Sequence, residues 1–220
     1  MSTTSASTVL APEPERAALA REAARADLAR FIAACYYEPG PEFAEEGLFG
    51  SIAAAAALVD GELAETAQRL GQAFANTGLE SLLVDHTQLF LGPVQAAARP
   101  YAAVWLSGQP QPMQASTVGV LELYAEAGFE VDEAFRDLPD HVAVELEFLY
   151  LLLHQATMAR VAGDAAAQAA WAQRRERFLT QHMGLWLGSF LLAQHDHARS
   201  SFYRELAELA ERFVRLAGTQ

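Results

Sequence analysis

Asp and His residues form three short clusters in the sequence. Their side chains are the best candidates in this chain for metal binding or catalysis. The clusters are Asp85-His86, Asp140-His141 and His195-Asp196-His197. Imidazole and carboxylate groups are common ligands of zinc and iron, so the clusters could build a metal site if folding brought them together. One hypothesis is therefore a helical, metal-dependent hydrolase or oxidase.

The spacings that helical metal enzymes use are absent from the sequence. A di-iron bundle requires Glu-x-x-His on its ligand helices, and no Glu here has a His three positions later. A His-Asp phosphohydrolase requires an Asp well downstream of His195-Asp196, and none follows position 196. His141 and Glu145 stand at i and i+4 and could share a metal, but such pairs are common by chance.

Motifs for other reactions are also missing from the sequence. It contains no nucleophile elbow, no phosphate-cradling loop and no dinucleotide fingerprint. We therefore predict a binding protein that is not an enzyme and that holds no metal or other cofactor. Elemental analysis of the purified protein separates this prediction from the metal-enzyme hypothesis.

Helices must position the Asp-His clusters. Between 79 and 91, apolar residues recur at helical spacing, and His86 lies on the same stripe as Leu79, Leu89 and Phe90. Pro139 is expected to open a helix that extends to Gly163, with Asp140 at its positive end. Leucines surround the axis of this helix, which predicts a buried central position.

The rest of the chain also follows helical patterns, and alternating strand patterns are absent. Helices are expected at about 14–37, 42–59, 62–77, 117–128, 165–178, 183–195 and 202–216. The segment Gly92 to Pro112 contains four prolines and two glycines, which predicts an irregular hinge loop at about 92–114. The sequence thus predicts an all-α fold, with a disordered tail at 1–12 and a single globular helical bundle over 13–220.

Composition limits the partners. All fifteen basic residues are arginines, and the formal net charge of −13 opposes binding to nucleic acid or to an anionic membrane. The one cysteine, Cys35, lies in an apolar stretch and fits a reducing compartment. We find no signal-peptide pattern and expect no segment with the ~20 apolar residues of a spanning helix. A cytoplasmic protein without membrane insertion is predicted.

Four motifs in a fixed order carry a resemblance to a known family. They are DHTQLFLGP at 85–93, a Pro-Tyr pair followed by Trp at 100–105, LPDH at 138–141 and ELEF at 145–148. This succession resembles the TorD/DmsD/NarJ family of redox-enzyme maturation chaperones over roughly residues 25 to 215. The sequence departs from the family at His86, where a bulky aromatic is usual, and at Gln114, where some members have glycine.

The resemblance implies a cytoplasmic chaperone that binds the twin-arginine signal peptide or another part of an apo-molybdoenzyme catalytic subunit. It would hold this client for insertion of the molybdopterin cofactor, before export or assembly. By position, Leu89 and Phe90 match the family's Leu-Phe pair, Tyr101 and Trp105 its hinge aromatics, and Asp140 and His141 its Asp-His pair. The peptide-binding residues that we predict are His86, Leu89, Phe90, Pro100, Tyr101, Trp105, Asp140 and His141.

The physical chemistry of such a peptide agrees with the resemblance. A twin-arginine signal joins a basic start to an apolar segment, so its receptor needs an apolar groove with acidic groups at one end. The chaperone is expected to be a monomer or a homodimer. A third hypothesis is a structural adaptor without a client peptide, and it predicts that the hinge aromatics are tightly buried.

Overall fold

The computed structural model describes residues 12–92, 96–107, 115–131 and 138–218. Within these residues the regular structure is helical, and one isolated bridge joins Tyr101 to His141. The prediction of an all-α fold is confirmed. Residues 1–11 of the predicted tail, residues 93–95 and 108–114 of the predicted hinge, and therefore Gln114, lie outside the described residues.

The α-helices share the bundle with two π-helical turns. The α-helices are α1 (Glu13–Ala34), α2 (Glu42–Glu45), α3 (Leu48–Val59), α4 (Gly61–Asn76), α5 (Leu79–His86), α6 (Ala102–Ser107), α7 (Ala115–Glu126), α8 (Val142–Val161), α9 (Ala165–Phe178), α10 (Gly184–His197) and α11 (Ser201–Gly218). The π-helical turns are η1 (Thr87–Leu91), directly after α5, and η2 (Leu179–Met183), between α9 and α10.

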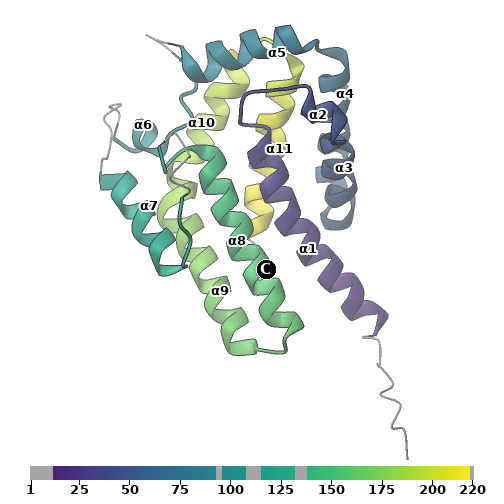
Figure 1. Cartoon of the computed structure of the whole chain (residues 1–220), viewed down its shortest axis with the longest axis vertical. Coiled ribbons are helices and arrows are strands. Elements are labelled where there is room, and N and C mark those ends of the chain that lie inside the picture. Colours follow the sequence, from purple (N-terminus) through teal and green to yellow (C-terminus); the bar gives the residue numbers. More distant parts are fainter. Residues whose placement is uncertain (1–11, 93–95, 108–114, 132–137, 219–220) are drawn as a thin grey trace, which may run out of the picture.

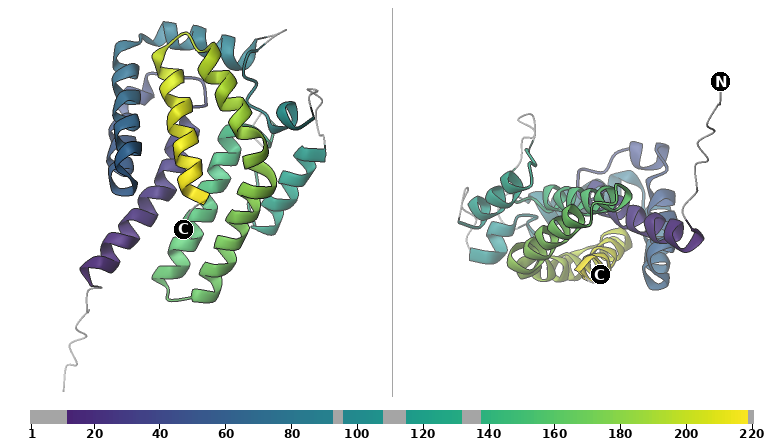
Figure 2. Two further views of the ribbon diagram at one scale, coloured as in Figure 1. Left: turned by 180° about the vertical axis from the view of Figure 1, so that it is seen from behind. Right: turned by 90° about the horizontal axis from the view of Figure 1, so that it is seen from below.

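Helices α1 and α8 run side by side through the middle of the molecule (Figure 1). Helix α9 packs on the other side of α8, whereas α3 and α4 pack together beyond α1. Seen from behind, α11 lies between α4 and α10, and α5 crosses one end of the bundle (Figure 2). Helices α6 and α7 form the edge opposite α3 and α4 (Figure 1).

Helix α8 is apolar over most of its circumference, and neighbouring helices cover most of its surface. By length and composition it could cross a membrane, which corrects our expectation that no segment reaches this length. However, 61% of its most apolar window is buried inside the protein. The predicted central position of this helix is confirmed, and burial in the bundle accounts for its apolar surface.

The terminal helix α11, expected at about 202–216, is amphipathic. Phe202, Leu206 and Phe213 are fully buried, and each such side chain contributes about 1.5–3 kcal/mol when it leaves water. On the polar side, Arg69 of α4 contacts Glu205 and Glu208 of α11, both at 2.9 Å. These partly exposed ion pairs add little to the stability of the α4–α11 contact.

Two glycines set helix boundaries that the sequence pattern missed. The predicted helix 42–59 is split into α2 and α3 because Gly47 adopts a left-handed conformation with φ 65°. Between α9 and α10 the chain stays helical through η2, where two separate helices were expected. A Cβ atom at Gly184 would lie 2.4 Å from the carbonyl oxygen of Leu179, so this π-turn requires glycine.

Gly163 ends α8 in a left-handed conformation (φ 71°), and the next amide, that of Asp164, donates to the Ala159 carbonyl (2.9 Å). Replacing Gly163 with alanine is expected to lower the free energy of unfolding by about 1–2 kcal/mol, because a Cβ is strained there. Thermal unfolding followed by circular dichroism measures the loss. Gly188→Ala in α10 is the control, since its Cβ would meet no atom within 4 Å. It should leave stability unchanged or raise it, and equal losses in both variants would contradict the explanation.

Candidate peptide-binding site

The segment 96–107 lies against the start of α8. The Ala102 amide donates to the Asp140 carbonyl (3.0 Å), and the Val142 amide donates to the Pro100 carbonyl (2.8 Å). Tyr101 and His141 form the isolated bridge between these two bonds. The contact therefore brings together five of the predicted site residues: Pro100, Tyr101, Trp105, Asp140 and His141.

Asp140 is fully buried and fixes α6 in place. Its Oδ2 accepts a hydrogen bond from the Ala103 amide (2.9 Å), and the Thr117 hydroxyl donates to the same oxygen at 3.3 Å. Amides in the first turn of a helix have no partner within that helix. The Asp140 carboxylate supplies the acceptor for such an amide in α6, that of Ala103, which lies 37 residues earlier in the chain. Its other oxygen, Oδ1, is buried without a hydrogen-bond partner among the described residues.

These contacts correct three expectations. The helix that Pro139 was expected to open begins at Val142, because Asp140 is used to hold α6. Ser116 or Thr117 was expected to cap α7, but Thr117 lies inside that helix and donates to Asp140. The predicted hinge is not irregular throughout, since α6 occupies residues 102–107, a stretch without Pro or Gly.

His141 caps the N-terminus of α8. Its Nδ1 accepts a hydrogen bond from the Ala143 amide (3.1 Å), which requires this ring nitrogen to be unprotonated. The ring stacks on Tyr37, with 6.2 Å between centroids and 5° between planes, and meets the edge of Tyr101 at 5.3 Å. His141 is therefore a structural element of the site, and the hypothesis that it shares a metal with Glu145 finds no support.

The hinge aromatics are only half-buried. The indole nitrogen of Trp105 donates to the Arg99 carbonyl (2.8 Å), and its ring meets Phe190 of α10 at 6.2 Å. Tyr101 likewise keeps part of its surface in solvent. The adaptor hypothesis predicted tight burial of these rings, and the structure does not show it.

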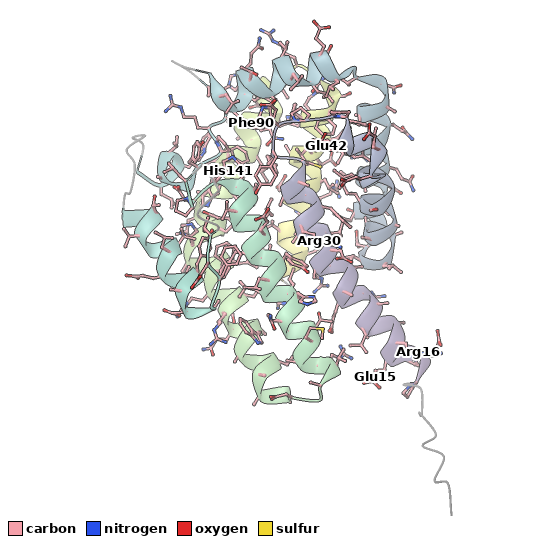
Figure 3. The ribbon with its side chains drawn as sticks, viewed as in Figure 1. Glu15, Arg16, Arg30, Glu42, Phe90 and His141 are labelled. Atoms are coloured by element: carbon pink, nitrogen blue, oxygen red, sulfur yellow. The ribbon has the colours of Figure 1, made fainter. Side chains whose placement is uncertain are left out.

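His86, Leu89 and Phe90 lie in the core next to this contact. Phe90 meets His86 at 5.2 Å and Phe190 at 6.1 Å, so Phe190 touches both Phe90 and Trp105. The Leu89 carbonyl accepts from the Ala98 amide (2.9 Å). Figure 3 shows Phe90 and His141 in the same half of the molecule. In contrast to the predicted inward stripe, Leu79 at the start of α5 is exposed.

Burial gives His86 an unusual environment. It lowers the pKa of the imidazole, although the Tyr36 backbone and the charge of Glu38 act in the opposite direction. His86 Nδ1 is buried without a hydrogen-bond partner among the residues described. The neutral ring replaces the aromatic that the resemblance implied at this position and makes an edge contact of the kind that an aromatic would make.

Sequence reasoning missed a buried network around Glu145. This carboxylate is fully buried; its Oε1 lies 2.7 Å from His182 Nε2, and its Oε2 accepts from the Trp186 indole at 3.1 Å. Burial raises the pKa of Glu145. Burial alone would lower the pKa of His182, but the hydrogen bond and charge of Glu145 raise it. The i, i+4 spacing of His182 and Trp186 in an apolar segment was the signal available in the sequence.

The three Asp-His clusters do not converge. Asp85 accepts from the amides of Arg199 (3.2 Å) and Ser200 (2.7 Å) and so holds the turn before α11. His195 and Asp196 are exposed on α10. Across the ranges that the structure describes, no group of three or more His, Cys, Asp or Glu side chains could hold a metal ion. The three clusters therefore do not form the shared metal site that the metal-enzyme hypothesis requires.

A cavity of about 420 Å³ lies next to the hinge, between α6, α7 and η2. It is lined by Leu106, Gly119, Glu122, Leu123, Glu126, Arg177, Gln181 and His182. Glu126 is paired with Arg177, whereas Glu122 is exposed and makes no ion pair within the described part of the chain. The cavity therefore combines leucine side chains with an available carboxylate.

Curated relatives and a solved structure resemble this chain. TorD chaperone proteins from Vibrio cholerae (strain El Tor Inaba N16961) and Shewanella loihica are 30% and 27% identical to it, over 60% and 63% of the chain. The matched regions span 59% and 61% of those relatives, less than two thirds of their length. A structure named as that of a redox enzyme maturation protein from Archaeoglobus fulgidus shares the fold. Its TM-score is 0.51 at 21% identity, over 87% of this chain and 91% of that one.

A protein-family model described as nitrate reductase delta subunit matches residues 56–191. This region contains all eight predicted site residues and the Glu145–His182 pair. Because the match covers more than half of the sequence, the chain belongs to the nitrate reductase delta subunit family, which confirms the resemblance to the TorD, DmsD and NarJ proteins.

Proposed function

We propose that the protein is a cytoplasmic, non-enzymatic chaperone for the apo catalytic subunit of a molybdoenzyme. It binds the twin-arginine signal peptide of that client, or part of its mature domain, until the molybdopterin cofactor has been inserted. The observation that carries this proposal is the family match over 56–191, supported by relatives that are named as TorD chaperones.

The proposed peptide site has two parts. One is the contact between residues 96–107 and the start of α8, and the other is the neighbouring cavity between α6, α7 and η2. The half-buried Tyr101 and Trp105 and the cavity residue Leu106 offer apolar surface to the apolar segment of the peptide. The exposed Glu122 offers a carboxylate to an arginine, and such pairs are charge-assisted and often bidentate. The remaining proposed peptide-binding residues, His86, Leu89, Phe90, Pro100, Asp140 and His141, are buried. They reach a peptide only if the segment 96–107 separates from α8.

The net charge of −13 assists the encounter with a basic peptide. Salt should therefore slow association more than it speeds dissociation, because screening weakens long-range attraction before it weakens buried apolar contacts. Stopped-flow or surface-based kinetics at several salt concentrations measure both rates.

Calorimetric titration with a twin-arginine signal peptide from a molybdoenzyme of the same genome tests the site. Trp105→Ala and Glu122→Gln are each expected to weaken binding about tenfold, which corresponds to about 1.4 kcal/mol. Trp105 loses apolar contact area, and Glu122 loses a charge-assisted hydrogen bond. Glu130→Gln removes an equal charge from an exposed position outside the cavity and should leave affinity unchanged.

A control peptide tests the site, and cells without this chain test the function. A peptide with both arginines replaced by glutamine should lose the sensitivity to Glu122→Gln, because the proposed partner of that carboxylate is gone. Equal effects of Glu122→Gln and Glu130→Gln would refute the site but not the function. The function itself fails if cells without this chain assemble molybdoenzymes with normal molybdenum content.

A further inference from the structure

We propose that Arg25 of α1 and Arg175 of α9 form a binding site for a small organic anion, whose carboxylate or phosphate group lies between the two guanidinium groups. The site is separate from the hinge region and does not depend on the proposed chaperone function. It lies where α1, α8 and α9 run side by side, away from α5 and α6 (Figure 1).

A cavity of about 350 Å³ gives the site its shape. Its lining contains Arg25 and Arg175, with Glu22, Thr157 and Gln168 as further polar residues. The other lining residues are small or apolar, namely Leu153, Ala156, Ala165, Ala169 and Ala172. A volume of this size exceeds a single inorganic anion and falls within the range of small-molecule sites. The alanines leave room for the organic body of the ligand.

The charge of this cavity is opposite to that of the protein. The chain carries a formal charge of −13, yet two arginines face the same cavity, and the one acidic residue in its lining, Glu22, is paired with Arg160. The Nε of Arg175 is buried and has no hydrogen-bond partner among the described residues. A buried guanidinium donor without an acceptor is unfavourable, and a bound oxyanion would supply the acceptor.

The charge of Arg25 acts on Arg175. Burial lowers the pKa of Arg25, against the opposing charge of Glu22. Burial and the positive charge of Arg25 lower the pKa of Arg175, against the opposing charges of Glu176 and Glu22. Two like charges in one partly buried cavity repel, and an anion between them turns this repulsion into attraction. Arginine suits the role because its planar fork binds carboxylate and phosphate through two parallel hydrogen bonds.

The test uses the full chain and two probes, citrate for carboxylates and pyrophosphate for phosphates, at ionic strength matched with sodium chloride. Isothermal titration should show saturable binding of at least one probe, and the preferred probe identifies the anion class. Arg25→Gln and Arg175→Gln should each weaken binding at least about tenfold. The saturating probe should also raise the melting temperature of the unmodified protein but not that of either variant.

Arg174→Gln is the matched control, since Arg174 is the neighbour of Arg175 but stacks on Trp171 at 4.7 Å and lies outside the cavity lining. This variant should bind the probes as the unmodified protein does. Circular dichroism verifies that each variant is folded. The proposal is overturned if neither probe saturates the unmodified protein at up to about 20 mM, a range that includes weak anion sites. It is equally overturned if Arg174→Gln weakens binding as much as Arg175→Gln.

Discussion

Replacing Glu145 with alanine is expected to lower the free energy of unfolding by about 3–5 kcal/mol, the range for breaking a buried ion pair from one side. The variant leaves His182 Nε2 and the Trp186 indole, both now bonded to Glu145, without an acceptor inside the core. Water cannot replace the carboxylate freely, because Glu145 is fully buried among α8, η2 and α10. Chemical denaturation followed by circular dichroism measures the loss.

Glu147→Ala is the matched control for this prediction. Glu147 lies on the same helix but is only half-buried, and it accepts one hydrogen bond, from the Tyr37 hydroxyl at 2.8 Å. Its removal should lower stability by about 0.5–1.5 kcal/mol. A Glu145→Ala protein as stable as Glu147→Ala would show that the Glu145–His182–Trp186 network does not hold α8 to α10.

The same pair should make stability depend on pH. The folded pKa of Glu145 lies above its ordinary value of 4.5, and that of His182 lies above 6.5. The folded protein therefore binds more protons than the unfolded chain between about pH 4.5 and the raised pKa of His182. Stability from this pair should fall as pH rises through that window. The Glu145→Leu/His182→Leu double variant should lose this component, and an unchanged pH profile would contradict it.

Asp140→Ala is expected to lower the free energy of unfolding by about 1.5–3 kcal/mol, because the buried Ala103 amide and the Thr117 hydroxyl lose a charged acceptor. Asp164→Ala is the control, since Asp164 caps α9 through the Ala167 amide (2.9 Å) at an exposed position. The control should lose about 1 kcal/mol. Thermal unfolding compares the two variants.

Peptide titration on the Asp140→Ala variant separates a role of Asp140 in the fold from a role in peptide binding. Destabilisation with unchanged peptide affinity would assign Asp140 to the fold and remove it from the proposed binding site. A loss of affinity without loss of stability would contradict the contacts that we describe for α6. Hydrogen exchange of residues 102–107 adds a local measurement, since α6 should open more readily when its cap is lost.

Periodicity was sufficient to predict the amphipathic helices. Helix α11 follows from the spacing of Phe202, Leu206 and Phe213, and the central position of α8 follows from leucines around its axis. Both patterns depend on neighbours along the chain. The pairing of Glu145 with His182 does not, because it depends on which helices meet, and sequence spacing carries no such information.

The motifs pointed to residues that the fold brings together around segment 96–107, but not to what these residues contact. Asp140 was expected at the positive end of its own helix, yet its carboxylate satisfies the Ala103 amide of another helix. Leu89 and Phe90 were predicted to bind the peptide, and both are buried in the structure. A buried polar group needs a hydrogen-bond partner. When that partner lies 37 residues away in the chain, tertiary packing determines which residue it is.

The π-turn η2 has a consequence for how the chain tolerates insertions and deletions. A π-turn holds one residue more than the α-helical turn it replaces. Because η2 absorbs that extra residue, Trp186 and Phe190 keep the orientation toward the core that an ordinary α-helical turn would give them. Deleting one residue from 179–183 would convert η2 into α-helix and leave both aromatic side chains facing the core. Keeping all five residues in α-helical geometry would instead rotate the rest of the helix by about 100° around its axis. This segment should therefore tolerate the loss of one residue better than the α-helical turns on either side of it.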